Sequence, residues 1–322
     1  PGLDEAGYET NETIFTRRDL PRSLAVIGGG PVGVELAQAF SRLGSKVAIV
    51  EAAPRLLGRM DPVAVETISQ CLAAEGIQLH LSSGISAVRR AGDHRQLQLE
   101  NGSTIECERI LVATGRRPAV HGLGLAAAGV EHDHRGIKVD ARMRTSRRHI
   151  YAVGDVCGPL QFTHVAEYQA GIVLANIVFR LPKKADYRVV PTVVYTDPEV
   201  AMVGLTEQQA QAGGIKYHVA EFPMADVDRA LADDAPAGQA RILISKGKIA
   251  GASITGAYAG ELIHELALAM QVKAKAKDIS ELIHAYPAYA QINRRTINSS
   301  YAALLQSRKV RMLAWLMNRL IP

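Results

Sequence analysis

The chain has 322 residues and a formal net charge of +5, and 48% of its residues are hydrophobic. This length suits two or three domains with buried cores, and the sequence holds no run of about 18 apolar residues that could span a membrane. The stretch from Leu282 to the end carries six basic residues and no acidic residue. The positive charge therefore belongs to this tail, and we expect no nucleic-acid partner.

The three cysteines, Cys71, Cys107 and Cys157, form no CxxC pair. Isolated cysteines are typical of a reducing compartment, so we expect a cytoplasmic protein without a disulfide framework. The chain begins at Pro1 with a polar, loop-like stretch, from which we expect it to be the later part of a longer polypeptide.

The first ordered elements are typical of a dinucleotide-binding fold. An apolar run over residues 23–28 predicts a buried strand, and the glycine-rich sequence GGGPVG follows it directly. A helix is expected over residues 34–44, and a second strand over residues 46–51 ends at Glu51. Strand, glycines, helix, second strand and acid occur in the order that NAD-binding domains require.

Each glycine of this motif has its own physical role. Gly28 allows a tight turn, Gly30 lets the backbone approach a pyrophosphate, and Gly33 lets the helix and strand pack closely. Glu51 can accept hydrogen bonds from ribose hydroxyls, and its charge would repel a 2′-phosphate, which favours NAD over NADP. Arg55 nearby could bind a 2′-phosphate, so NADP remains an alternative to NAD. The structural alternative for the whole motif is a glycine turn that binds no ligand.

The next elements continue an α/β pattern. Asp61 and Pro62 are typical of a helix start, and the helix is expected to end at Gly76. Asn101-Gly102 is a hairpin signal between antiparallel strands. The expected strands are 77–81, 85–90, 95–100, 103–108 and 108–118, the last ending in a glycine loop.

A further apolar strand is expected over residues 149–156, and it ends at Gly154-Asp155. In open α/β sheets, ligands bind at the carboxyl ends of strands, so this dipeptide is a candidate ligand contact. An ordinary Gly-Asp turn is the alternative. A helix is expected to follow over residues 163–179.

Four ordered motifs, GGGPVGVE, VATGRRP, YAVGDV and YTDPEVAMVGLTE, resemble those of the flavoprotein disulfide reductases, a family that includes dihydrolipoamide dehydrogenase, glutathione reductase and mercuric reductase. The resemblance covers nearly the whole chain. It implies an α/β protein with a Rossmann-like NAD-binding domain, the remnant of an FAD-binding domain and an α+β dimerisation domain. The implied divisions are a linker over 1–20, the NAD-binding domain over 21–118, the FAD-binding remnant over 119–188 and the dimerisation domain over 189–322.

The resemblance also implies cofactor contacts. Glu35 would lie near the nicotinamide. His164 would lie beside the flavin ring, and the alternative is that it is an ordinary residue at the start of a helix. The implied NAD(H) contacts are Gly28, Gly30, Gly33, Glu35, Glu51 and Gly115, and the implied FAD contacts are Gly154, Asp155, Thr163 and His164.

Two parts of the family pattern are missing from this chain: the first GxGxxG motif and the redox-active cysteine pair. We therefore expect that a domain of roughly 100–200 residues is absent. The chain alone would then hold an incomplete FAD site and would not turn over substrate.

The sequence HAYPAYAQ, residues 284–291, lies where thiol-reducing members of the family carry H-x-H-P-T-x-S-E. Tyr286 takes the position of the acid–base histidine, and Gln291 takes that of its glutamate partner. Because tyrosine has a pKa near 10, it is a poor base at neutral pH, and efficient lipoamide or glutathione chemistry is not expected. Tyr286 and Tyr289 are the candidate catalytic residues, with interface packing as the alternative. Mercury is also disfavoured, because the chain ends without the terminal cysteine pair of mercuric reductases.

The last segment has apolar residues at helical spacing and arginines between them. A basic amphipathic helix of this kind can lie on an anionic membrane surface, and docking against protein is the alternative. The apolar positions are Val310, Leu313, Leu316, Met317 and Leu320.

We therefore expect the parent protein to be an FAD-dependent NADH oxidoreductase. It would act as a homodimer joined through the C-terminal domain, on a small-molecule electron acceptor that the sequence leaves open. One alternative is a non-catalytic NAD-binding and dimerisation module, and another is a peripheral membrane quinone reductase. No metal site is predicted.

Overall fold

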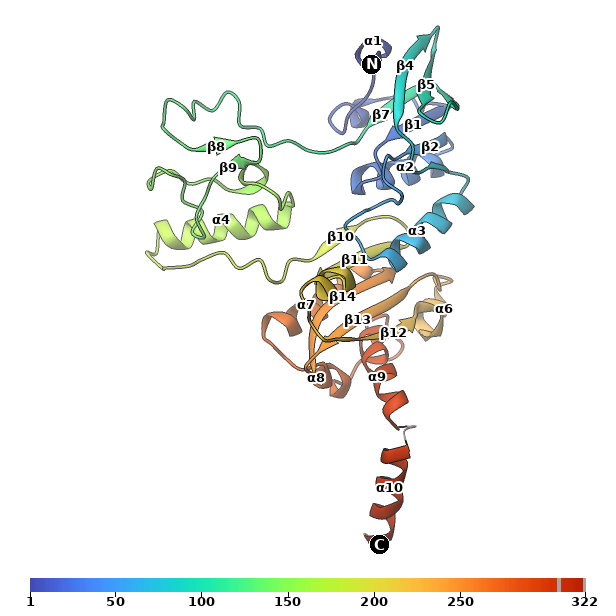
Figure 1. The fold of residues 1–322 in the computed structure, drawn as a ribbon, viewed down its shortest axis with the longest axis vertical. Coiled ribbons are helices and arrows are strands. Elements are labelled where there is room, and N and C mark those ends of the chain that lie inside the picture. The colour runs from blue at the N-terminus through green and yellow to red at the C-terminus, as the bar shows by residue number, and fades with distance from the viewer. Residues whose placement is uncertain (306–307, 321–322) are drawn as a thin grey trace. The chain divides into compact units, whose positions relative to one another are not determined.

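The computed structural model describes residues 1–305 and 308–320. The chain forms two compact units (Figure 1). Unit 1 combines Pro1–Thr114 with Pro191–Pro322, and unit 2 is Gly115–Val190.

The first half of unit 1 contains a parallel four-stranded sheet in the order β3-β2-β1-β7. Strand β1 lies between β2 and β7, and Ala25 at its centre pairs with Ala48 and Ile110. The core residues of β1 and β2 are almost fully buried, which explains their uninterrupted apolar sequences. The elements are β1 (Ser23–Ile27), α2 (Pro31–Arg42), β2 (Lys46–Val50), α3 (Pro62–Ala74), β3 (Gln78–His80) and β7 (Arg109–Val112).

Helix α3 begins as its sequence predicts. The side chain of Asp61 accepts a hydrogen bond of 2.8 Å from the backbone nitrogen of Val63, and Pro62 occupies the first helical turn. The predicted N-cap is therefore confirmed.

A small antiparallel sheet in the order β4-β5-β6 precedes β7. Its second hairpin turns at Asn101 and Gly102, where Gly102 has φ +86°, so the expected hairpin is confirmed. Helix α1 (Leu3–Ala6) and the 3-10 helix η1 (Ile14–Thr16) bury Ala6 and Ile14 in the core of this half of unit 1. The strands are β4 (Ile85–Ala91), β5 (His94–Leu99) and β6 (Thr104–Cys107).

The second half of unit 1 is a five-stranded antiparallel sheet in the order β10-β11-β14-β13-β12. Helix α7 packs on β14 and β11, and helix α9 packs on β12 (Figure 1). The strands are β10 (Thr192–Val194), β11 (Glu199–Gly204), β12 (His218–Pro223), β13 (Gln239–Ser245) and β14 (Lys248–Gly256). The helices are α5 (Glu207–Ala212), η3 (Met224–Asp226), α6 (Asp228–Ala232), α7 (Ala259–Gln271), α8 (Ala276–Glu281), α9 (Gln291–Leu305) and α10 (Arg308–Leu320).

The two halves of unit 1 share a core and a buried ion cluster. Val194 and Val200 of the second half pack in the same apolar cluster as Leu56 of the first. The Arg241 side chain is 8% exposed and lies 2.7 Å from Asp61 Oδ2. Arg241 therefore joins strand β13 to the start of helix α3.

Unit 2 is built from β8 (His132–Asp133), β9 (Gly136–Ile137), η2 (Gly154–Cys157) and α4 (Thr163–Ile177). The strand predicted over residues 149–156 is wrong. Tyr151 forms only an isolated bridge with Arg144, and Gly154–Cys157 is a 3-10 helix. A strand needs a continuous hydrogen-bonded neighbour, and an apolar run alone does not supply one.

Helix α10 confirms the helix expected in the tail. The side chains of Leu313 and Leu320, which belong to its predicted apolar face, lie outside the described residues. Among the helices that the structure describes, α10 included, none is long and apolar enough to cross a membrane.

Candidate nucleotide and acceptor sites

The turn between β1 and α2 is closed by Gly28. Its φ is +108°, and its nitrogen donates a hydrogen bond of 2.9 Å to the carbonyl oxygen of Val50. A Cβ atom at this position would lie 2.6 Å from the carbonyl oxygen of Ala113. Only glycine fits this turn without strain.

The other two glycines of the motif differ in their surroundings. A Cβ on Gly33 would lie 2.0 Å from the carbonyl oxygen of Gly28, so the start of α2 packs tightly on the turn. A Cβ on Gly30 would meet no described atom within 4 Å. Gly30 is also the N-cap of α2, and no described side chain caps that end. The helix therefore presents backbone N–H groups beside open space, which suits a phosphate.

Glu51 follows strand β2 and contacts the glycine turn directly. Its Oε2 accepts a hydrogen bond of 2.6 Å from the nitrogen of Gly29, and its Oε1 accepts one of 2.8 Å from the nitrogen of Ala53. The carboxylate thus shapes the turn. Sequence reasoning missed this role, because it treated Glu51 only as a ligand contact.

Glu35 lies in the second turn of α2 and is half-buried. Burial raises the pKa of its carboxyl group, while the hydrogen bond from the Tyr195 nitrogen lowers it, with a net upward shift. That hydrogen bond is 2.9 Å long and joins α2 to the segment after β10. No sequence motif predicts this contact between residues 160 positions apart.

The same face of α2 makes two more contacts with this segment. Gln38 Oε1 accepts a hydrogen bond of 2.8 Å from the Asp197 nitrogen, and Gln38 Nε2 donates one of 2.7 Å to the Asp197 carbonyl. Arg42 forms ion pairs with Glu75 at 2.7 Å and with Asp197 at 2.8 Å. This face of helix α2 is therefore joined both to the end of helix α3 at Glu75 and to the segment between β10 and β11 at Asp197.

In unit 2, the Gly154-Asp155 turn is anchored to helix α4. The nitrogen of Gly154, whose φ is +80°, donates a hydrogen bond of 2.7 Å to Gln169 Oε1. Arg116 Nη1 lies 3.0 Å from Asp155 Oδ2. Asp155 as an FAD contact stays a prediction, and the contacts of Arg116 and Gln169 with this turn were not predicted from the sequence.

The remaining residues predicted to contact FAD lie at the start of α4. Thr163 and His164 are exposed, and the His164 ring stacks on Phe162 with the ring centroids 5.1 Å apart. Gly115 has φ +142°, and a Cβ there would meet no described atom within 4 Å.

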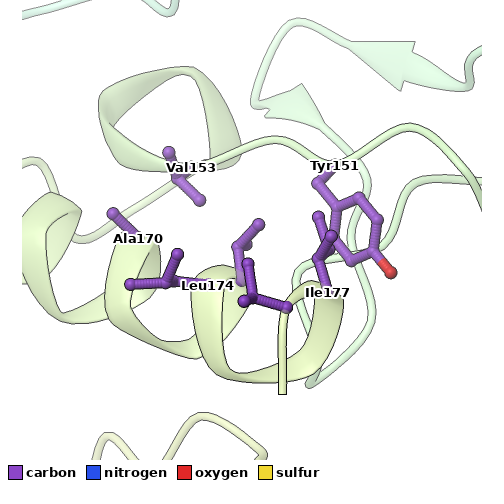
Figure 2. Close-up of a pocket in the computed structure, with 7 residues that line it drawn as sticks. Tyr151, Val153, Ala170, Leu174 and Ile177 are labelled. Atoms are coloured by element: carbon purple, nitrogen blue, oxygen red, sulfur yellow. The ribbon is translucent and has the colours of Figure 1, made fainter. Parts of the chain in front are cut away.

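Helix α4 also borders an apolar groove of about 360 Å³ (Figure 2). Figure 2 shows Tyr151 and Val153 facing the side chains of the helix. The groove is lined by Tyr151, Val153, Ala170, Val173, Leu174, Ile177 and Val178.

The segment 284–291 carries the candidate acceptor residues. Tyr286 is 70% exposed. The hydroxyl of Tyr289 donates a hydrogen bond of 3.1 Å to Asp233 Oδ2, and its ring meets Tyr258 edge-on at 5.1 Å. Burial, and then this hydrogen bond, raise the pKa of Tyr289. Gln291 is buried, and its Oε1 has no hydrogen-bond partner among the described residues.

His284 differs from the two tyrosines. Its side chain is 5% exposed, and its Nε2 lies 3.0 Å from Glu265 Oε1. Its side chain is enclosed and paired with a glutamate of helix α7, although the residue as a whole is only partly buried.

Comparison with known proteins fits these features. The family "Pyridine nucleotide-disulphide oxidoreductase" matches residues 1–170, and the dimerisation domain of the same family matches residues 190–295. The chain belongs to the pyridine nucleotide-disulphide oxidoreductase family. The predicted family, its mixed α/β fold and its cofactors, FAD with a nicotinamide nucleotide, are thereby confirmed at the level of the family.

Individual relatives give the same result. A mercuric reductase of Bacillus cereus is 36% identical over 297 residues, which is 90% of this chain and 47% of the relative. A dihydrolipoyl dehydrogenase of Chlamydia muridarum is 37% identical over 282 residues, which is 87% of this chain and 60% of the relative. The chain thus spans about half to three fifths of the length of these curated relatives.

Among solved structures, the chain is similar to a Cu(II) complex of the HOCl-induced flavoprotein disulfide reductase RclA from Escherichia coli. The TM-score is 0.88 at 27% identity, over 92% of this chain and 70% of that one. Among the described residues of the present family member, no group of three or more His, Cys, Asp or Glu side chains is arranged to hold a metal ion.

Proposed function

We propose that the protein containing this chain is an FAD-dependent NADH oxidoreductase that passes electrons to a small-molecule acceptor. The observation that carries the proposal is the glycine turn of residues 28–33 together with the carboxylate of Glu51. The turn offers open space at the N-terminus of α2, and the acid lies beside it, directly after strand β2.

NADH would bind along the carboxyl ends of β1 and β2. Backbone N–H groups at the start of α2 would hold the pyrophosphate next to Gly30. The Glu51 carboxylate has lone pairs beyond its two backbone bonds, and these would accept hydrogen bonds from the adenosine ribose. Arg55 donates a hydrogen bond of 2.7 Å to the carbonyl of Gly58 and keeps further N–H donors, so the preference for NADH over NADPH rests on the charge of Glu51, which would repel a 2′-phosphate.

FAD would contact unit 2. Asp155, fixed by Arg116 and by the anchored Gly154, would accept hydrogen bonds from the flavin's polar chain, and Thr163 and His164 would contact it at the start of α4. When bound, FAD supplies the two-electron chemistry that links NADH to the acceptor. The division into an NAD-binding domain, an FAD-binding portion and a dimerisation domain is part of this proposal.

The acceptor would meet Tyr286 in a homodimer joined through the C-terminal domain. A disulfide substrate is disfavoured because Tyr286 and Gln291 replace the proton-transfer pair. The side chain of His284 is tied to Glu265 and does not restore that pair at the exposed position. Quinones, metal ions and oxygen remain as acceptor classes. A lipid-dissolved quinone is an acceptor only for a protein that contacts a membrane, so that alternative depends on helix α10.

Titration of NADH and NADPH into the chain, followed by nicotinamide fluorescence, tests the nucleotide site. We expect NADH to bind more tightly than NADPH. The Glu51→Gln variant should bind NADH more weakly and discriminate less between the two nucleotides. Glu66→Gln, on the exposed face of α3, is the matched control and should change neither. A folded chain that binds neither NADH nor NADPH would contradict the proposal.

The enzymatic part needs the whole protein with FAD. NADH oxidation should then depend on added FAD and on one class of acceptor. If NADH binds but the whole protein does not oxidise it with any acceptor, the alternative of a nucleotide-binding and dimerisation module is favoured instead.

A further inference from the structure

Helix α10 exposes a stripe of large side chains that no part of the proposed enzyme uses. Met312 is 62% exposed, Trp315 55% and Leu316 42%. Arg319 is also exposed. These positions are spaced i, i+3, i+4 and i+7, so they lie on one side of a helix. We call these four residues the α10 stripe.

The stripe combines apolar and cationic chemistry. The guanidinium of Arg319 lies over the Trp315 ring, 4.3 Å from its centroid. Arg311 is exposed beside the stripe. The sequence from Leu282 onward contains no Asp or Glu, so this segment holds no acidic residue that could neutralise these charges.

This chemistry separates two kinds of partner. Met, Trp and Arg are also common at protein interfaces, but a protein partner would have to supply acidic residues, and a second copy of this segment has none. At a lipid surface, Trp and the aliphatic side chains enter the boundary between headgroups and acyl chains, and arginines remain at the phosphates.

We propose that the α10 stripe docks on an anionic phospholipid surface. Met312, Trp315 and Leu316 would enter the headgroup boundary, with Arg311 and Arg319 bound to lipid phosphates. The helix would lie in the plane of the surface, since no described helix of the chain is suited to crossing a membrane. The proposal does not depend on nucleotide binding or on catalysis.

The chain offers a clean reporter, because Trp315 is its single tryptophan. The probes are vesicles of phosphatidylcholine mixed with phosphatidylglycerol, and vesicles of phosphatidylcholine alone. With the anionic vesicles at low salt we expect a blue shift of tryptophan emission and co-sedimentation of the chain. High salt or neutral vesicles should abolish both signals.

Matched charge variants test the surface itself. Arg319→Gln should lower the partition coefficient on anionic vesicles roughly fivefold, which is the effect of one basic residue near such a surface. Arg89→Gln removes the same charge from an exposed position on β4 and should leave partitioning unchanged. Leu316→Asn should weaken binding to the anionic vesicles without removing its salt dependence.

Three results would overturn the proposal. One is an emission maximum and a sedimentation profile that anionic vesicles leave unchanged. The second is an equal loss of binding in the Arg89 and Arg319 variants, which would reduce the effect to net charge. The third is a blue-shifted emission without lipid that depends on protein concentration, which would assign the stripe to contact with a second copy of the chain.

Discussion

The imidazole of His284 and the carboxylate of Glu265 form a partly buried pair, with Nε2 and Oε1 3.0 Å apart and the two side chains 5% and 26% exposed. The other oxygen of Glu265 accepts a hydrogen bond of 2.8 Å from Asn293 Nδ2. Helix α7 thereby holds both ends of the segment 284–291, His284 at its start and Asn293 just beyond it. Tyr286, between them, is 70% exposed. The pair thus positions the segment that presents Tyr286.

Removing the histidine should therefore destabilise the C-terminal domain. His284→Ala leaves one oxygen of a partly buried Glu265 without its partner, and we expect a loss of about 1–3 kcal/mol in the free energy of unfolding. Urea denaturation measures this loss. His218→Ala, on the exposed side of β12, is the control. Equal midpoints for the two variants would show that the pair contributes nothing to stability.

The glycine turn supports a prediction that separates folding from nucleotide binding. In Gly33→Ala, the new Cβ would lie 2.0 Å from the Gly28 carbonyl, so α2 must shift and the thermal midpoint should fall by several degrees. Gly30→Ser faces open space and places a good N-cap residue at a suitable backbone conformation. This variant should keep its thermal midpoint and lose NADH affinity about tenfold, because its side chain occupies the space of the pyrophosphate. An equal loss of stability in both variants would disprove the inference that Gly33 is tightly packed and Gly30 is not.

Local sequence patterns predicted the helices and strands in the first half of unit 1, because each pattern depends on residues that are close together in the sequence. The apolar run of β1, the glycines after it and Asp61 at the start of α3 are signals of this kind. The contacts that hold the site are not local. Glu51 bonds back to Gly29, and Glu35 meets Tyr195 across 160 residues. No periodicity or motif marks such partners, because only the folded chain brings them together.

The error over residues 149–156 has a related cause. The segment is apolar enough for a strand, but strand formation is decided by the neighbour with which it pairs. Tyr151 has a single bridge partner, Arg144, and the backbone turns into a 3-10 helix at Gly154. The prediction of Asp155 as an FAD contact stays a prediction that does not depend on the strand, because the dipeptide Gly154-Asp155 is a turn signal in either conformation.

Arg241 forms ion pairs with three carboxylates within unit 1. Its guanidinium contacts Asp61 at 2.7 Å, Glu207 at 2.9 Å and Glu221 at 2.7 Å, and its side chain is 8% exposed. Arg241→Met leaves the buried Asp61 carboxylate without its charge partner, and we expect a loss of about 3–5 kcal/mol in unfolding free energy. Arg229→Met breaks an exposed pair with Asp233 and should cost at most about 1 kcal/mol. Denaturant midpoints compare the two, and similar losses would refute the special role of Arg241.

Glu35 gives a pH-dependent prediction. Because burial raises its pKa in the folded protein, the native state holds this proton more tightly than the unfolded state does. Stability contributed by Glu35 is then present below its unfolded pKa and falls as the pH rises through the folded value. Glu35→Gln keeps an oxygen for the Tyr195 nitrogen and removes the titration. The stability of this variant relative to the natural chain should increase from acid to neutral pH, as measured by urea midpoints. A stability difference between Glu35→Gln and the natural chain that does not change with pH would contradict the raised pKa of Glu35. Glu66→Gln provides the control.

Tyr286 and Tyr289 form a natural pair for testing the acceptor site in the whole protein with FAD. The Tyr286 side chain is 70% exposed, so Tyr286→Phe should leave stability unchanged. If its hydroxyl donates a proton or hydrogen bond to the reduced acceptor, turnover with that acceptor should fall about 100-fold, while NADH affinity stays constant. Tyr289→Phe removes a hydroxyl already bonded to Asp233 and should alter stability slightly and turnover little. Full activity of the Tyr286 variant with every acceptor would assign the exposed tyrosine to packing between subunits, and the acceptor would then be oriented by other groups.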